Sequence, residues 1–366
     1  MSKDKKNKMI MACIATCVFI VILLIIVMTG KVEQQDRNKV GFIMSGSVDE
    51  EGWNGMHYKA IEKACKELDV ELEVKENIRE FTGECKDAIK ELADNGANMI
   101  VLSSYGYSEE VKDVVKEYPE IVFYGNSSEY HEDNMTSYFV RMYQARYLSG
   151  ILAGMRTESN RIGYVAAMSN NEVNRGISAF TLGVRRVNPE AKVIVAWTGE
   201  WDDRKAEEDA AWCLLGEQVD VMTYHQNQTY VSAVADAAGI ASIGYHQMLE
   251  NGSEQHMTAV ICNWECVYEE LIRSFLRGKG NEVDNYWIGL QEEAVGLAGY
   301  SEGVSKEEQE AIEKAKTEIL SGKDVFSGVI YDTEGTLRCD ETEIISDEIL
   351  LEHFEWFAEG VEFYEE

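Results

Sequence analysis

Short apolar segments alternate with amphipathic segments along most of this chain of 366 residues, and this alternation limits the folds open to it. Val40 to Met44 has the character of a buried strand, and the residues after it place apolar side chains on one helix face: Ala60, Ile61, Ala64, Cys65 and Leu68. A buried strand followed by an amphipathic helix is a β-α unit. Repetition of this unit predicts parallel sheets covered by helices on both faces, an α/β fold.

Seven further segments are predicted to be strands: Met99 to Leu102, Ile121 to Tyr124, Ile162 to Ala167, Val193 to Trp197, Val219 to Tyr224, Ala241 to Tyr245 and Thr258 to Cys262. Six amphipathic segments between or after them are predicted to be helices: Glu109 to Tyr118, Tyr138 to Met155, Val173 to Val187, Arg204 to Leu215, Tyr230 to Ala238 and Glu265 to Arg277. The 336 residues after position 30 suffice for two medium domains, so we expect two lobes.

The N-terminus predicts a membrane anchor. Residues 9–30 are uncharged and follow four lysines, Lys3, Lys5, Lys6 and Lys8. At a rise of ~1.5 Å per residue this run spans roughly 33 Å as a helix, close to the thickness of the bilayer core. The lysines favour a cytoplasmic tail at residues 1–8, so a linker at 31–38 and the rest of the chain are expected outside the cytoplasm.

Two alternatives to a retained anchor remain open at this stage. A cleaved secretory signal would have an apolar run of ~7 to 15 residues and small residues at its end, whereas this run is longer and ends in Met28, Thr29 and Gly30. A lipid attached to Cys17 would leave much of the apolar run, Val18 to Met28, beyond the modified cysteine. Both alternatives fit the sequence less well than a single membrane-spanning helix.

Charge and cysteine content narrow the possible partners. The net charge of −32 repels the phosphates of nucleic acid and anionic lipid head groups, so a polymeric nucleic acid is not expected as a partner. Outside the anchor stand six cysteines, a number that permits disulfides without determining their pairing: Cys65, Cys85, Cys213, Cys262, Cys266 and Cys339. We expect no metal and no cofactor.

The segments that follow the predicted strands are rich in aromatic and amide side chains. Ligands of such folds bind beyond the carboxyl ends of the strands, where aromatic faces can stack on a planar ring and amides can bond to its edges. Each of these side chains also has a purely structural interpretation, such as core packing for Trp53, a hydrophobic staple for Trp201 and a structural role for His246. Their joint occurrence favours a site for a flat, hydrogen-bonding ligand, with these candidates: Trp53, Asn54, Tyr105, Asn126, Trp201, Gln226, His246, Asn263 and Trp264.

Several stretches resemble the basic membrane protein (Bmp) family, exported solute-binding proteins of ABC importers that include purine nucleoside receptors. The resemblance covers nearly the whole region after the anchor and rests on segments that occur in the family's order: Tyr143 to Gly150, Arg161 to Ala167, Arg175 to Gly183, Val187 to Pro189, Gly328 to Asp332 and Glu355 to Val361.

This resemblance implies a two-lobed type I periplasmic-binding-protein fold with two parallel sheets, a hinge of three crossing segments and a ligand held in the cleft. The crossings are expected near Asn126 to Glu132, Tyr245 to Met248 and Tyr286 to Leu290. The first lobe would then comprise residues 39–128 and 246–285, and the second lobe residues 129–245 and 286–366. Closure of the lobes on the ligand would create the surface recognised by the ABC permease and ATPase subunits.

The resemblance also implies roles for individual residues. Glu50 matches an acidic residue that precedes the first aromatic, here Trp53 followed by Asn54, and Trp201 matches a second aromatic. Nucleoside receptors of the family hold ribose with an aspartate where this chain has His246, and their nearby lysine is replaced by Asn263 or Trp264. A purine stacked by Trp53, Trp201 or both is therefore expected, with free base and nucleoside both open.

Two other functional classes compete with a transport role. An exported nucleoside-processing enzyme would need a carboxylate cluster on calcium or a glycine-rich phosphate loop, and the sequence has neither Gly-x-Gly-x-x-Gly nor His-Glu-x-x-His. A surface sensor could use the same fold without transport. The expected cytoplasmic tail of eight residues is, however, too short to form a signalling domain. The sequence favours a membrane-anchored, non-enzymatic solute-binding protein for a purine base or nucleoside.

Overall fold

The computed structural model describes residues 38–50, 52–128, 130–280 and 285–365. The expected cytoplasmic tail, the anchor at 9–30 and the linker up to residue 37 lie outside these residues. Among the described residues, no helix combines the length and the apolar composition needed to cross a bilayer.

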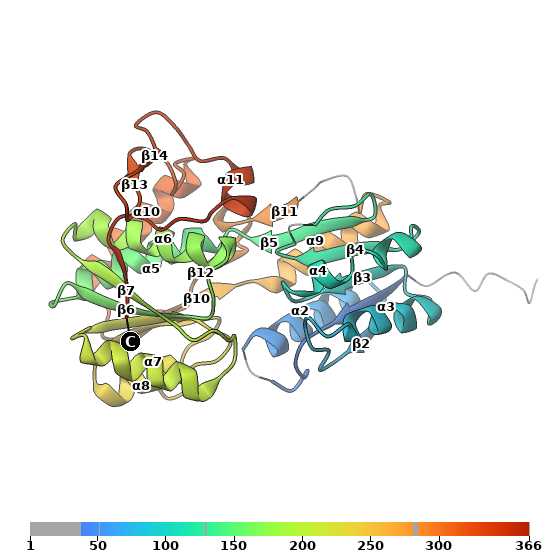
Figure 1. The fold of residues 1–366 in the computed structure, drawn as a ribbon, viewed down its shortest axis with the longest axis horizontal. Helices are drawn as coiled ribbons and strands as arrows, with labels where there is room; N and C mark the ends of the chain where they lie inside the picture. The colour runs from blue at the N-terminus through green and yellow to red at the C-terminus, as the bar shows by residue number, and fades with distance from the viewer. Residues whose placement is uncertain (1–37, 51, 129, 281–284, 366) are drawn as a thin grey trace, which may run out of the picture.

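Two lobes lie side by side, each built around its own sheet (Figure 1). The sheet of the first lobe has the order β11-β5-β4-β3-β1-β2 and is entirely parallel. Its strands are β1 (Lys39–Ile43), β2 (Glu71–Lys75), β3 (Met99–Leu102), β4 (Val122–Asn126), β5 (Met135–Val140) and β11 (Asn285–Ile288). The helices of this lobe are α2 (Trp53–Glu67), α3 (Glu84–Asp94), α4 (Tyr107–Glu110), η1 (Val115–Glu117) and α9 (Trp264–Leu276).

The sheet of the second lobe has the order β12-β10-β9-β8-β6-β7-β15 and is parallel except for β12, which pairs antiparallel to β10. Its strands are β6 (Arg161–Ala166), β7 (Lys192–Trp197), β8 (Val221–His225), β9 (Ala241–Tyr245), β10 (His256–Cys262), β12 (Val295–Leu297) and β15 (Val361–Phe363). Its helices are α5 (Met142–Arg156), α6 (Asn171–Val187), α7 (Arg204–Gly216), α8 (Tyr230–Ala238), η2 (Leu290–Glu292), α10 (Lys306–Leu320) and α11 (Asp347–Glu352).

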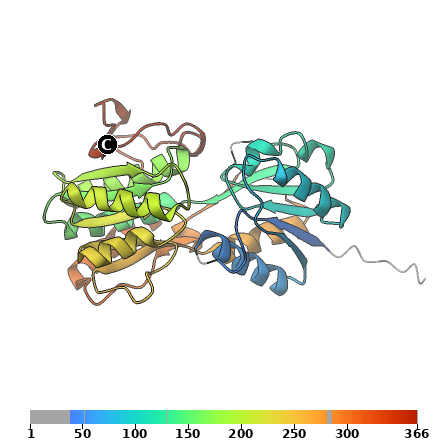
Figure 2. The ribbon, with the colours of Figure 1, turned by 60° about the horizontal axis from the view of Figure 1, so that its bottom comes forward.

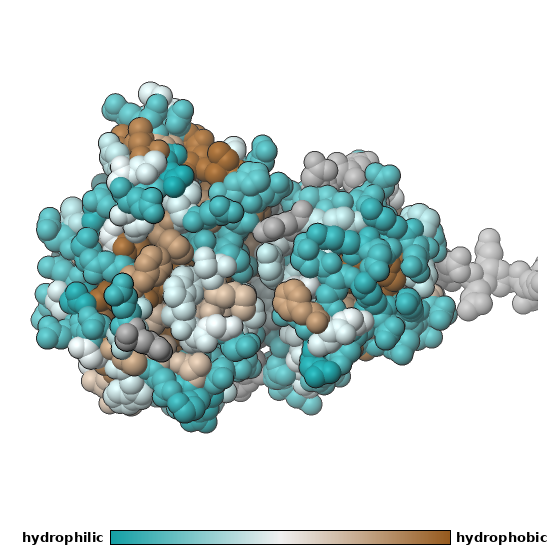
Figure 3. Space-filling model, in the orientation of Figure 1, coloured by the Kyte–Doolittle hydropathy of each residue, from teal (hydrophilic) through white to brown (hydrophobic). Residues whose placement is uncertain are grey.

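A small C-terminal hairpin of β13 (Ile330–Tyr331) and β14 (Leu337–Cys339) lies on the outside of the second lobe, beside α10 and α11 (Figure 1). Apolar side chains gather on this part of an otherwise largely hydrophilic face (Figure 3), and three of them are exposed: Val329, Leu337 and Ile344. The six cysteines of the described chain are free thiols.

Three segments connect the lobes, and both views show them side by side between the two sheets (Figures 1 and 2). The first joins β5 to α5 at Arg141, the second joins β10 to α9 at Asn263, and the third follows β11 at Gly289. The third lies within the expected Tyr286 to Leu290.

The expected positions of the first two crossings were wrong. β5 pairs with β4 in the first sheet, so the chain leaves the first lobe after Val140 and not near Asn126. The segment Tyr138 to Met155 was predicted to be one amphipathic helix, but its beginning is part of a fully buried strand. β10 pairs with β9 in the second sheet, so the return crossing lies after Cys262 and not near Tyr245.

These pairings move two segments between the lobes. Residues 130–140 belong to the first lobe, and residues 246–262 belong to the second lobe. The other predicted strands lie close to their expected positions, and the bounds of β3, β9 and α8 coincide with the predicted segments. The strands β2, β11, β12, β13, β14 and β15 were not predicted.

One buried acid in the second lobe has no hydrogen-bond partner within the described part of the chain. The Glu207 side chain on α7 is buried, and neither of its carboxyl oxygens is paired. Burial, reinforced by the negative charges of Asp202 and Asp203, raises the pKa of Glu207 to about 8. The carboxyl group is therefore protonated in the folded protein at neutral pH.

Glu207→Gln is expected to make the protein more stable than the wild type in alkaline solution. An unfolded glutamate has a pKa of about 4.3, so the stability of the neutral buried acid is complete below that pH and is lost as pH rises towards 8. The unfolding free energy of Glu207→Gln, minus that of the wild type, should grow by at most ~1.4 kcal/mol per pH unit as the pH rises through that window. Thermal or urea unfolding of the full chain at pH 5 and pH 8.5 measures it.

Glu208→Gln provides the matched control, because Glu208 is the next residue and pairs with Arg204 near the surface at 2.8 Å. It should gain no stability with rising pH. A wild type and a Glu207→Gln variant with parallel pH profiles would contradict the assignment of a neutral carboxyl group.

Candidate functional site

The carboxyl ends of strands from both sheets enclose a cavity between the lobes. It holds about 520 Å³ of space between the protein atoms, part of which is open solvent. The lining residues of the first lobe are Ser45, Trp53, Glu80, Ser104, Tyr105 and Asn126. Those of the second lobe are Glu172, Trp201, His225, Asn227, Tyr245 and His246.

Five of the sequence-predicted site residues meet at this cavity: Trp53, Tyr105, Asn126, Trp201 and His246. Trp53 is the first residue of α2 and is half-buried, and its Nε1 donates to the carbonyl of Ser103 at 3.0 Å. Trp201 is also half-buried, and its carbonyl accepts from the backbone nitrogen of Asn227 at 3.0 Å. The Trp53 indole is thereby held in place, whereas the bond of Trp201 holds only its backbone, and the two residues come from different lobes.

Asn126 and His246 bring unused hydrogen-bonding atoms to the cavity. Asn126, the last residue of β4, is 2% exposed, and His246, directly after β9, is 4% exposed. The Nδ2 of Asn126 and both ring nitrogens of His246 have no partner among the residues described. A buried polar group without a hydrogen-bond partner costs free energy. A ligand that forms hydrogen bonds to these atoms would remove that cost.

His246 is held by aromatic neighbours from both lobes. Its ring lies 3.6 Å from the Tyr245 ring and 5.3 Å, edge to face, from the Trp53 ring. Burial lowers the pKa of His246 well below its usual value, and the nearby His225 and His57 act in the same direction. His246 is therefore a neutral imidazole, with one nitrogen to donate and one to accept.

Five other sequence-predicted residues are not among those that line the cavity. Glu50 and Asn54 bond to one another, with 2.8 Å between Asn54 Nδ2 and Glu50 Oε2, and Glu50 also accepts from the backbone nitrogen of Ser47. These bonds shape the loop between β1 and α2. This loop leads directly into Trp53, so the two bonds help to hold Trp53 in position.

Gln226, Asn263 and Trp264 likewise have structural surroundings. The Gln226 side chain is buried against the turn that carries Trp201, with its Nε2 oriented towards the Glu200 and Trp201 carbonyls at 2.9 and 3.0 Å. Asn263 is exposed on a crossing segment. Trp264 is 2% exposed and packs 4.0 Å from the His57 ring inside the first lobe.

Sequence reasoning missed two acidic residues and a histidine of the cavity: Glu80, Glu172 and His225. Glu80 follows β2, which was not predicted, and its Oε1 accepts from the backbone nitrogen of Gly106 at 2.6 Å. Glu172 lies in the first turn of α6. His225 ends β8 and its Nε2 lies 3.2 Å from Glu172 Oε1 and 3.1 Å from the Tyr245 hydroxyl. The segment after β6 was a detectable strand end that the sequence reasoning left out.

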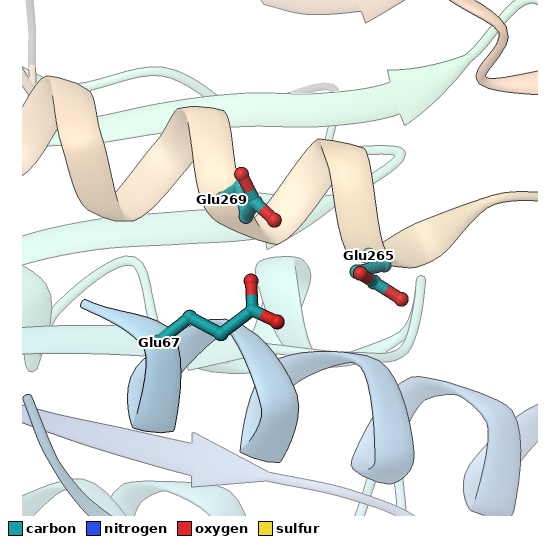
Figure 4. Close-up of side chains that lie close together, drawn as sticks. All are labelled: Glu67, Glu265 and Glu269. Atoms are coloured by element: carbon teal, nitrogen blue, oxygen red, sulfur yellow. The ribbon is translucent and has the colours of Figure 1, made fainter. Parts of the chain in front are cut away.

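A second group of acids lies away from the cavity, between α2 and α9. Glu67, Glu265 and Glu269 bring carboxylate oxygens within 4.8 Å of one another (Figure 4). Lys63 pairs with Glu265 and lies 3.9 Å from Glu67, and Arg273 lies 3.4 Å from Glu269. Because Lys63 and Arg273 offset the negative charges of these glutamates, we interpret the group as a network of surface ion pairs.

The described geometry defines a two-lobed α/β protein with an inter-lobe ligand cavity, the architecture of a solute-binding protein. Residues 37–326 match the Bmp family, described as ABC transporter substrate-binding protein PnrA-like. The chain belongs to this family, and its class is that of ABC-transporter substrate-binding proteins.

Individual relatives support this membership. A purine-binding protein of Brucella abortus is 30% identical over 88% of this chain and 92% of its own. A Haloferax volcanii protein described as a glucose-binding protein of an ABC transporter is also 30% identical, over 91% of this chain and 85% of its own. The structure of a solute-binding protein from Aeropyrum pernix has a TM-score of 0.66 with 19% identity, over 78% of this chain and 92% of its own, and shows the same fold.

The lobes touch at the rim of the cavity, at Gly52. This residue precedes α2 with φ +79°, and a Cβ atom there would lie 2.2 Å from the carbonyl oxygen of Asn227 in the second lobe. A side chain at position 52 is therefore incompatible with this approach of the lobes.

Gly52→Ala is expected to hold the lobes further apart. Small-angle scattering of the full chain in detergent, with the detergent contrast-matched, should show a larger radius of gyration than for the wild type. Gly83→Ala is the control, because Gly83 also precedes a helix with φ +85° but has nothing within 4 Å of an added Cβ. Equal scattering of the two variants would contradict the proposed role of Gly52 in lobe contact.

Proposed function

We propose that this protein captures a purine base or purine nucleoside in the inter-lobe cavity and delivers it to an ABC importer. One observation carries the proposal: two tryptophans from opposite lobes face a cavity that also contains the unpaired Asn126 amide and the unpaired His246 imidazole. This combination fits a flat ring with hydrogen-bonding edges.

The two kinds of side chain contribute different parts of the recognition. An aromatic stack on Trp53 or Trp201 contributes ~0.5 to 1.5 kcal/mol beyond the burial of apolar surface. The Asn126 Nδ2 donates to a ring nitrogen or carbonyl, and the neutral His246 both donates and accepts. A purine presents such donors and acceptors around one plane, so it can use the faces and the edges of the site together.

The two relatives at 30% identity carry different ligand descriptions, purine and glucose. Aromatic side chains pack against the C–H faces of a sugar ring as well as against a planar base, so the two tryptophans fit both descriptions. The purine is preferred because the unpaired Asn126 Nδ2 and the neutral His246 match the ring nitrogens and the exocyclic groups of a base.

The remaining parts of the proposal concern the membrane and the transporter. We expect residues 9–30 to anchor the chain with the two lobes outside the cytoplasm. Binding of ligand across both lobes favours the closed arrangement, because the ligand contacts both lobes only when they approach. The closed form is the one that the permease would recognise, with the ATPase supplying energy on the other side.

Trp201→Ala is expected to weaken the binding of a purine base or nucleoside by more than about tenfold, or ~1.4 kcal/mol, because it removes one of the two stacking surfaces. Calorimetric titration of the full chain in detergent measures the affinity. Trp212→Ala is the matched control: Trp212 lies on α7 in the same lobe but is 55% exposed and outside the cavity. Unchanged affinity in Trp201→Ala would remove Trp201 from the ligand site.

A further inference from the structure

The C-terminal segment forms a short helix that is fixed to the second lobe. Residues 327–365 follow the part of the chain that matches the family, and they include α11, which packs against α6. The Arg175 guanidinium on α6 donates to the Leu350 carbonyl of α11. The Asn174 amide, also on α6, donates to the carbonyl of Phe354 at 3.2 Å. α11 therefore moves with the second lobe.

Arg141, at the first crossing between the lobes, is held by a strand of the first lobe. Its backbone nitrogen donates to the Ile288 carbonyl of β11 at 2.7 Å, and its Nε donates to the Trp287 carbonyl at 3.1 Å. The guanidinium carbon also lies 4.2 Å from the Trp287 ring, within the range of a cation–π contact. Because β11 pairs with β5 in the first sheet, these contacts fix the charge of Arg141 to the first lobe.

Arg141 and Asp347 form an ion pair between these two parts of the molecule. Asp347 is the first residue of α11, and its two carboxylate oxygens accept from the two terminal nitrogens of the guanidinium, one of them at 2.8 Å. The two side chains are 22% and 55% exposed. A bidentate arginine–carboxylate pair is the geometry in which a partly exposed ion pair contributes to stability. Opposite charges therefore join the two lobes at the hinge.

A pocket lies between the rest of α11 and the first lobe. Its walls include His131 and Asn285 of the first lobe and Glu348, Leu351 and Glu352 on the side of α11. It holds about 1000 Å³ of space between the protein atoms, part of which is open solvent. Because packed side chains do not fill this space, the ion pair at its edge carries the attraction between α11 and the first lobe.

We infer that Arg141 and Asp347 form an inter-lobe clasp, which stabilises the approach of the two lobes at the cavity and so raises the fraction of closed protein. Each partner is fixed to a different lobe, so a rotation of one lobe relative to the other changes the distance between the two charges. The pair is intact in the structure in which the lobes touch at Gly52, and it therefore favours that arrangement. This inference holds for any ligand of the cavity.

Asp347→Arg tests the clasp, because it replaces attraction by repulsion between two guanidinium groups. Small-angle scattering of the full chain without ligand, in contrast-matched detergent and at a low salt concentration of ~50 mM, measures the radius of gyration. We expect a larger radius for Asp347→Arg than for the wild type. Glu348→Arg is the matched control: it changes the charge of α11 equally, and Glu348 has no ion-pair partner among the described residues. Its radius should equal that of the wild type.

Two further measurements separate an electrostatic effect from structural damage. At ~0.5 M salt the difference in radius between Asp347→Arg and Glu348→Arg should shrink, because salt screens exposed charges. In an Arg141→Gln background, Asp347→Arg should raise the radius by less than half as much, because the opposing charge has been removed. Damage to the fold at position 347 would depend on neither salt nor Arg141.

Three results would overturn the inference: equal radii for Asp347→Arg and Glu348→Arg at low salt, a difference that salt leaves unchanged, or a difference that persists in full without Arg141. If Asp347→Arg fails to fold, Asp347→Asn with Glu348→Gln as its control gives the same comparison with a smaller expected difference. A chain that binds no purine but shows the salt-dependent difference would lose the proposed function and retain the clasp.

Discussion

Parallel strand pairing in both sheets is the constraint from which the site follows. Strands of a parallel sheet end at a common edge, and the loops beyond that edge are the place where such folds bind ligands. In this protein the chain crosses between the lobes three times, and the loops after β1, β3 and β4 meet those after β7, β8 and β9 at one cavity. The cavity is formed where the edges of the two sheets at the carboxyl ends of their strands meet.

A run of neighbouring ring and guanidinium side chains connects the two lobes through this cavity. The Arg146 guanidinium carbon lies 4.1 Å from the Tyr245 ring. From Tyr245 onward the ring centroids of successive residues are 3.6, 5.3, 4.1 and 4.0 Å apart, in the order Tyr245, His246, Trp53, His57 and Trp264. Only the contact between His246 and Trp53 crosses from one lobe to the other. Both residues line the cavity, so a ligand bound there would lie beside the contact that joins this run of side chains across the lobes.

Much of this arrangement was accessible from the sequence, for physical reasons that differ between elements. β3 and β9 were predicted to the residue because they are short buried runs between polar segments, and the common strand edge correctly brought Trp53, Asn126, Trp201 and His246 together. β5 was missed because its buried run continues into the apolar start of α5. Periodicity cannot separate a buried strand from a buried helix.

The failures in the candidate site have a different origin. Asn263 and Trp264 follow a strand, but β10 leads into a crossing segment, so Trp264 is buried in the first lobe. Glu50, Asn54 and Gln226 are polar residues near strand ends that bond within the protein. Only the three-dimensional partners of a polar side chain show whether it is free to meet a ligand.

The central claim is that the cavity recognises a purine. Thermal melting of the full chain in detergent, against a panel of purine and pyrimidine bases, nucleosides and simple sugars, tests it most directly, because a ligand that binds only the folded state stabilises it by RT ln(1 + [L]/Kd). The account predicts a concentration-dependent rise in melting temperature with purine compounds and none with glucose. A rise with sugars alone would contradict it.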